Sequence, residues 1–103
     1  MNIPNTVKIG GFTWTVEQRE DVTREGDAFG LTHFTKQKIF LDPNETQQKK
    51  EQVLLHEILH AIWWQQGLGA RYKDKDDLEE EMVQAMSMGL YQVLKDNKFN
   101  YEK

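Results

Sequence analysis

The sequence of 103 residues contains no cysteine, which excludes a disulfide framework, a thiolate metal site and a cysteine nucleophile. Any metal ion must therefore be bound by histidine and carboxylate side chains. No stretch approaches the roughly 18 apolar residues of a membrane-spanning helix, and residues 1–6 contain no apolar signal-peptide core. We therefore expect no membrane partner and a cytoplasmic location.

Positive charge is also scarce. The chain has 13 Lys and Arg against 17 Asp and Glu, which gives a formal net charge of −4 at pH 7. This balance provides no general attraction to nucleic acid, so we expect no nucleic-acid partner. Charged residues make up 29% of the chain and hydrophobic residues 38%, as in folded globular proteins, and the length fits one hydrophobic core. We predict a single domain, residues 1–103.

Alternation of apolar and polar residues in the first part of the chain predicts a small sheet. The clearest strand has Phe12, Trp14 and Val16 on one face and follows the hairpin signal Gly10-Gly11. Four segments are predicted as strands: residues 6–10, 12–18, 28–34 and 38–41. Because short turns join two pairs of these segments, we expect a small antiparallel sheet of three to four strands.

Two helices are predicted after the sheet, so the expected fold class is α+β. The first begins at Asp42-Pro43, where Asp42 can cap the helix and Glu45 stands three residues later. It continues to Gln66 and is followed by Gly67, a residue typical of helix ends. The tryptophans at 63 and 64, near its end, are expected in the core.

The second helix is predicted to begin at Asp76-Asp77, with Asp76 as the cap, and to extend to Lys95. Apolar residues recur along it at helical spacing and predict a face that packs against the first helix. This face consists of Leu78, Met82, Ala85, Met86, Gly89, Leu90 and Val93. The methionines at 82, 86 and 88 are expected to fill the core.

The segment His56-Glu57-Ile58-Leu59-His60 lies inside the first predicted helix, in the longest apolar run of the chain. His56 and His60 are one helical turn apart and about 40° apart around the axis, so both imidazoles can reach one metal ion. Glu57 lies about 100° from His56, beside such an ion without binding it. This HExxH pattern is typical of zinc sites in which the glutamate is the general base. We predict that His56 and His60 bind Zn²⁺ and that Glu57 is catalytic.

A catalytic zinc ion usually has three protein ligands. His33 lies on a predicted strand, where a single histidine is more often exposed or hydrogen-bonded in the core. The start of the second helix, Glu79-Glu80-Glu81, is the better source, although acidic residues also favour a helix start through its dipole. Helical spacing directs Glu81 away from the first helix and leaves both Glu79 and Glu80 possible as the third ligand.

A short sheet, an HExxH helix and a following helix that begins with glutamate together resemble the gluzincin metallopeptidases. More narrowly, the chain resembles small phage and bacterial zincin-like domains related to the ImmA/IrrE type. Residues 54–62 resemble the active-site helix of that family. The second helix is similar to its third-ligand pattern at Glu80, Val83, Met86, Ser87 and Leu90, with Val83 in place of a small residue.

The resemblance implies that Glu80 is the third ligand and that the protein is a zinc-dependent peptidase with a peptide or protein substrate. It also implies that residues 28–34 form a sheet edge that holds the peptide, with Gly30 allowing close backbone approach or a bulge. A bacterium or a phage-infected host cell is the implied setting. The family's auxiliary donor, a His or Tyr, has three candidates here: His33, Tyr72 and Tyr91.

One alternative function keeps the metal site but not the catalysis. In this interpretation the chain is a zinc-binding protein that acts by docking on another protein, and Trp63 and Trp64 beside the site serve as the contact. The two functions share the ligands His56, His60 and Glu80, and they differ in whether Glu57 has a chemical role.

Overall fold

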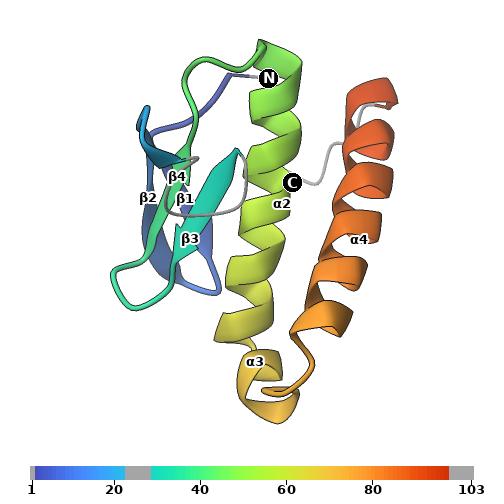
Figure 1. Cartoon of the computed structure of the whole chain (residues 1–103). Coiled ribbons are helices and arrows are strands. Elements are labelled where there is room, and N and C mark those ends of the chain that lie inside the picture. Colours follow the sequence, from blue (N-terminus) through green and yellow to red (C-terminus); the bar gives the residue numbers. More distant parts are fainter. Residues whose placement is uncertain (1, 23–28, 98–103) are drawn as a thin grey trace.

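The computed structural model describes residues 2–22 and 29–97, which form three layers (Figure 1). A sheet packs on one side of α2, and α4 packs on the other. The strands are β1 (Thr6–Ile9), β2 (Phe12–Gln18), β3 (Gly30–His33) and β4 (Lys38–Leu41); the helices are α2 (Gln47–Gln65), α3 (Leu68–Arg71) and α4 (Asp76–Asp96). The predicted α+β class is confirmed. Among the described helices, none is long and apolar enough to cross a membrane.

The sheet has the order β1-β2-β4-β3 and is mixed, so the prediction of an antiparallel sheet was wrong. The β1–β2 and β3–β4 pairs are antiparallel, but β2 and β4 run parallel. The composition of the strands explains this order. Ile39, Phe40 and Leu41 of β4 are buried, so β4 occupies a central position, whereas β3 contains Gly30 and polar residues and lies at the edge. The predicted edge segment thus lies at an edge, although Ala28 falls outside the described residues.

The core lies between the sheet and α2. Trp14, Ile39 and Leu41 are fully buried there against Leu54 of α2. Gln65, the last residue of α2, accepts a hydrogen bond from Nε1 of Trp14 at 3.1 Å and donates one to the carbonyl of Ile9 at 2.6 Å. These bonds attach the end of α2 to the first two strands, which fixes the helix that carries the two histidines.

Both helix starts differ from the predictions. The side chain of Asp42 accepts a hydrogen bond from the Asn44 amide at 2.9 Å, a local turn that leaves it unable to cap a helix. The cap of α2 is instead Thr46, whose hydroxyl accepts from the amide of Lys49 at 3.2 Å. In α4, Asp76 is the first helical residue and its cap position, Lys75, makes no side-chain capping bond.

The outer face of α4 corrects a further prediction. Only Val83 and Ser87 of the described helix are buried. The helix packs on α2 as predicted, but the predicted apolar face was wrong, because its large members are 37 to 60% exposed: Leu78, Met82, Met86, Leu90 and Val93. The three methionines expected in the core are instead 45 to 60% exposed. Within the described part of the chain, no further layer covers the side of α4 that faces away from α2. Near the end of α2, Trp63 is buried as predicted, but Trp64 is 42% exposed and stacks on Phe34.

Candidate metal centre

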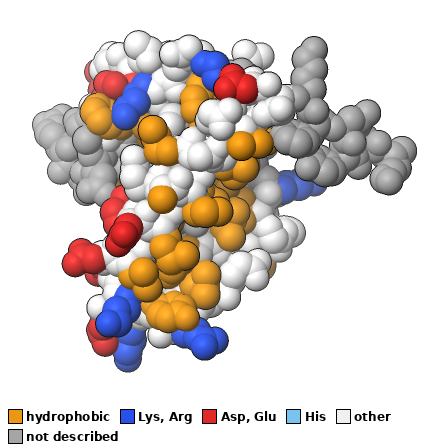
Figure 2. Space-filling view, turned by 90° about the vertical axis from the view of Figure 1, so that its right-hand side faces the viewer, with side chains coloured by type: hydrophobic (Ala, Val, Ile, Leu, Met, Phe, Trp, Pro, Cys, Tyr) orange, Lys and Arg blue, Asp and Glu red, His pale blue; other side chains and the backbone are white. Residues whose placement is uncertain are grey.

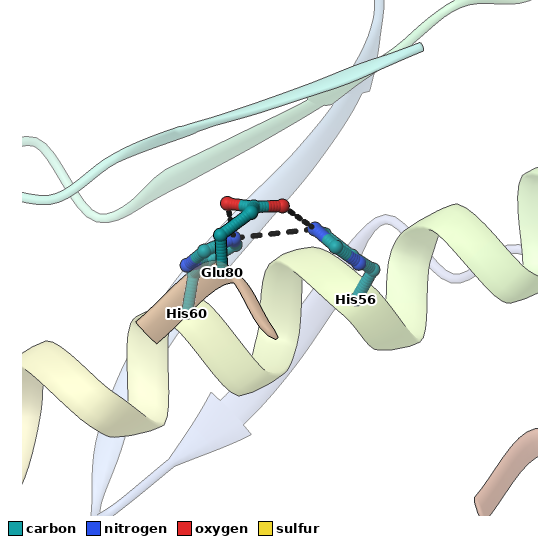
Figure 3. Close-up of side chains that lie close together, drawn as sticks. All are labelled: His56, His60 and Glu80. Carbon is teal, nitrogen blue, oxygen red and sulfur yellow. Dashed lines mark hydrogen bonds and ion pairs between the residues drawn. The ribbon is translucent and has the colours of Figure 1, made fainter. Parts of the chain in front are cut away.

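The two histidines of the HExxH segment lie in the middle of α2, where the helix passes beneath the first turns of α4. Each is only 9% exposed. Their Nε2 atoms face each other at 3.2 Å. The carboxylate of Glu80 spans the pair, with Oε1 3.0 Å from Nε2 of His56 and Oε2 3.2 Å from Nε2 of His60 (Figure 3). Residues predicted from two separate helices therefore converge on one point.

Glu79 and Glu80 occupy different positions, which distinguishes two residues that helical spacing left equivalent. Glu80 contacts both Nε2 atoms. Oε2 of Glu79 lies 2.6 Å from Nδ1 of His60, on the opposite edge of that imidazole. A carboxylate can only accept here, so the Nδ1 of a neutral His60 carries the hydrogen, and its Nε2 presents a lone pair to Glu80.

His56 has a similar partner on its outer edge. Its Nδ1 lies 3.5 Å from the hydroxyl of Ser87, which is fully buried. That hydroxyl donates its hydrogen to the carbonyl of Gln84 at 3.1 Å, and is therefore an acceptor toward His56. In a neutral His56 the hydrogen is therefore also on Nδ1, and the lone pair of Nε2 points toward Glu80.

The consequence is a cluster of electron-pair donors that face one another. Two imidazole lone pairs and a carboxylate repel one another unless a proton or a cation lies among them. One ligand atom from each of His56, His60 and Glu80 lies within 4.8 Å of the others. Tetrahedral coordination with bonds of about 2.0–2.1 Å separates ligand atoms by about 3.4 Å, close to the distances observed. This group could hold a metal ion, and its donor chemistry fits a borderline cation such as zinc.

Glu57 lies beside this cluster and is not part of it. It is 6% exposed, and its Oε1 accepts a hydrogen bond of 2.6 Å from the hydroxyl of Thr32 on β3. Burial raises the pKa of Glu57, while the bond from Thr32 and the two nearby imidazoles act in the opposite direction. The net direction is upward, which brings the carboxylate closer to the range of a general base at neutral pH.

Two hollows meet at Glu57. One, of about 130 Å³, is also lined by Gly30, Gln52 and His56. The other, of about 250 Å³, is lined by Thr32, His60, Asp76 and Glu79 among others. The Glu57 side chain therefore borders space on both sides, between the edge strand and the start of α4.

The raised pKa of Glu57 predicts a pH-dependent stability difference in the metal-free protein. The carboxyl group of Glu57 binds its proton more tightly in the folded state than in the unfolded state. Its contribution to the free energy of unfolding is therefore full at low pH and is lost as pH rises above 4.5 toward the pKa of the folded state. Glu57→Gln cannot ionise, so the variant is expected to melt above the wild type at neutral pH and to lose that advantage below pH 4.5. Thermal unfolding in a chelator over this range is the measurement.

The matched control for this experiment is Glu81→Gln, which changes an exposed glutamate of α4. It should leave the pH profile unchanged. If the Glu57→Gln and wild-type melting temperatures stay parallel at every pH, Glu57 is ionised at no unusual cost in the folded state.

At Gly30, strand β3 lies close to α2. A Cβ atom on this residue would lie 2.6 Å from Cγ1 of Val53 and 3.0 Å from both Cγ and Oε2 of Glu57. The backbone of Gly30 is thus closely approached by side chains of α2, whereas the approach of a peptide at this residue stays a prediction. The contact explains how an edge strand and the catalytic candidate lie side by side.

We expect Gly30→Ala to destabilise the protein by about 1–3 kcal/mol, because the added methyl group forces β3 away from α2. Chemical denaturation measures the loss. The control is Gly69→Ala in α3, where the nearest atoms to an added Cβ are at 3.6 Å, an ordinary contact distance. Equal stability of the two variants would contradict the close packing at Gly30.

The three candidates for an auxiliary donor lie elsewhere. Tyr91 donates a hydrogen bond to Glu51 at 2.9 Å, and Tyr72 packs against Trp63 with ring centroids 6.1 Å apart. His33 ends β3 opposite Lys38. None of the three lines either hollow beside Glu57.

The sequence interpretation missed Thr32, which holds Glu57 in place. Its signal was available in the strand pattern, because Thr32 is two residues from Gly30 and therefore on the same face of β3. The sequence interpretation also missed that Glu79 orients His60. This role depends on where α4 lies relative to α2, which the sequence alone does not give.

Comparisons with protein-family models, with curated proteins and with solved structures find no match. What the molecule itself defines is an α+β domain with a mixed four-stranded sheet and a His–His–Glu group that could hold a metal ion.

Proposed function

We propose that the protein is a zinc-dependent peptidase of the gluzincin type, with His56, His60 and Glu80 as metal ligands and Glu57 as general base. The observation that carries the proposal is the convergence of the two Nε2 atoms and the Glu80 carboxylate within 4.8 Å, with a buried carboxylate beside them. A structural metal site requires the first feature but has no use for the second, since burying Glu57 costs free energy.

A zinc ion bound by this group would activate a water molecule as nucleophile and polarise a carbonyl group. The chain's own contribution is the positioning of ligands and proton transfer. Glu79 and Ser87 hold the two imidazoles with both Nε2 atoms directed at one point, at 2.6 Å and 3.5 Å from the respective Nδ1 atoms. Such outer partners fix the tautomer and orientation of ligand histidines.

Glu57 is positioned to move the proton. Thr32 occupies Oε1 through its 2.6 Å hydrogen bond, which leaves Oε2 to accept a proton from the attacking water. The raised pKa of the carboxylate makes it a stronger base than an exposed glutamate, and the same oxygen can then deliver the proton to the leaving amine. The nearby imidazoles act against this rise in the pKa of Glu57.

The substrate is proposed to be a peptide that binds along β3. This strand ends the described sheet, so one side of it can pair with an added strand. Thr32 and Gly30 of β3 border the hollows at Glu57, which places the edge next to the base. A peptide bound in this way would pass directly over the metal group.

The alternative function is a zinc-binding protein that docks on a partner without catalysis. Trp64 favours it, since this side chain is 42% exposed and forms a stacked pair with Phe34 at 5.5 Å. Exposed stacked aromatics are typical of contact sites. This alternative predicts that biological activity depends on Trp64 and not on Glu57.

Elemental analysis of the purified protein is the experiment that tests the shared basis of both functions. We expect about one zinc ion per chain, and we expect a chelator to lower the melting temperature, because a ligand that binds only the folded state stabilises it by about 4 kcal/mol at 1,000 times its Kd. Added zinc should restore the original value. If the protein contains no zinc and zinc leaves its melting temperature unchanged, the metal site model is wrong.

A further inference from the structure

One flank of α4, beside the side that faces α2, carries an apolar stripe, defined here as Met82, Met86, Leu90 and Val93. These side chains are 37 to 60% exposed. Figure 2 looks onto this side of the molecule and shows hydrophobic side chains gathered in a band along it. Monomeric proteins seldom leave a continuous apolar strip of this length uncovered.

The apolar stripe is turned away from the metal ligand Glu80 but adjoins Glu79. Met82 is about 200° from Glu80 around the helix, whereas Glu79 is one turn before Met82 on the same side. The described residues bury Val83 and Ser87 of α4 against α2 and leave the stripe exposed. None of the four stripe residues lines either hollow at Glu57.

Gly89 lies in the middle of the apolar stripe. Glycine weakens a helix relative to alanine, so a glycine far from either end of a 21-residue helix needs a reason. Packing among residues 2–22 and 29–97 does not supply one, because a Cβ atom on Gly89 would meet nothing there within 4 Å. What the missing side chain offers is a gap into which a side chain from outside can fit.

We propose that the apolar stripe binds the same stripe of a second copy of this chain, with the two α4 helices antiparallel and the twofold axis at the level of residues 87 and 88. In this arrangement Met86 of each copy fits the gap at Gly89 of the other, and Met82 faces Val93. The most exposed large hydrophobic side chain thus meets the residue that has no side chain, and symmetry repeats the contact. The apolar stripe of one copy is therefore complementary in shape to the apolar stripe of the other copy.

Charge selects the antiparallel orientation. The first turn of α4 is acidic, with Asp76, Asp77 and Glu79, and the last turn carries Lys95. Parallel helices would place two acidic starts next to each other, whereas antiparallel helices place each acidic start beside an end that bears both Lys95 and Asp96 and has no net side-chain charge. The helix dipoles have the same preference.

A stable dimer buries about 800 Å² on each partner. A helix of 21 residues is about 31 Å long, so a contact about 25 Å wide is needed, which is more than the width of one helix. The stripe adjoins a hollow of about 230 Å³ that continues onto α2 and α3, lined by Leu59, Ile62, Trp63, Leu68, Met82, Val83 and Met86. The contact would therefore include α2 and α3 as well as α4.

Sedimentation equilibrium of the full chain between about 1 µM and 1 mM tests the proposal. We expect a dimer, and we expect Met86→Gln and Gly89→Gln each to raise its Kd at least tenfold. Met88→Gln is the matched control, because Met88 is 53% exposed but lies about 200° from Met86 around α4. It should leave the Kd unchanged.

The absence of cysteine allows the orientation to be tested directly. A mixture of Met82→Cys and Val93→Cys chains should form the mixed disulfide in preference to either symmetric one. A preference for the symmetric disulfides would overturn the antiparallel arrangement. A chain that stays monomeric, or a dimer that all three glutamine variants weaken equally, would overturn the proposal and reassign the stripe to a different protein.

Discussion

Replacing Glu57 with glutamine is expected to reduce peptide hydrolysis by a factor of about 10² to 10⁴ while the protein keeps its metal ion. Glutamine is nearly isosteric and can still accept the hydrogen bond from Thr32, but it cannot take a proton from the attacking water. The cluster of His56, His60 and Glu80 does not include Glu57, so metal content should stay at the wild-type level. Cleavage of a peptide library, followed by mass spectrometry, gives the rate.

The control for this variant is Glu81→Gln, which changes an exposed carboxylate near the metal ligands. It should retain the wild-type rate. Wild-type hydrolysis by Glu57→Gln would exclude Glu57 as the base. Loss of hydrolysis with full biological activity would favour the docking function over the peptidase.

Replacing Glu80 with alanine is expected to weaken zinc binding by more than about 100-fold, the upper range for losing an outer partner of a metal ligand. Glu80 contacts both Nε2 atoms, at 3.0 and 3.2 Å, so its loss removes the only carboxylate between them in the described structure. Glu79→Ala should weaken binding by about 10- to 100-fold, because it removes the acceptor that orients His60.

Competition with a chromophoric chelator measures both affinities, and Glu81→Ala serves as the control with no expected change. The order of the effects matters more than their size. If Glu79→Ala has the larger effect, Glu79 becomes the ligand when zinc binds, and Glu80 is a surface residue. Circular dichroism establishes that each variant keeps its helices.

The contrast between Glu79 and Glu80 illustrates what the sequence could predict. Positions 56, 57 and 60 lie within one helix, so helical geometry alone places them relative to one another. The third ligand lies on another helix, and its identity depends on how far α4 is shifted and rotated against α2. That register is fixed by Val83 and Ser87, whose burial no local pattern predicts.

The fold, like the metal site, was predictable within single elements but not in how those elements pack together. Four strands and two long helices followed from local periodicity, and the close approach at Gly30 followed from residue type. The parallel pairing of β2 with β4 did not, because an alternating strand pattern carries no direction. The methionines of α4 were misassigned because helical spacing identifies an apolar face without showing what covers it.

The shallow attachment of α4 has a consequence for how the metal centre opens. In the described structure only two of its side chains are buried, so little buried apolar surface is exposed when this helix separates from α2. The Trp14–Gln65–Ile9 bonds, by contrast, hold α2 to the sheet. Since Glu79 and Glu80 belong to α4, transient local unfolding of this helix removes one ligand and one orienting group together, and provides a route by which an ion can enter or leave.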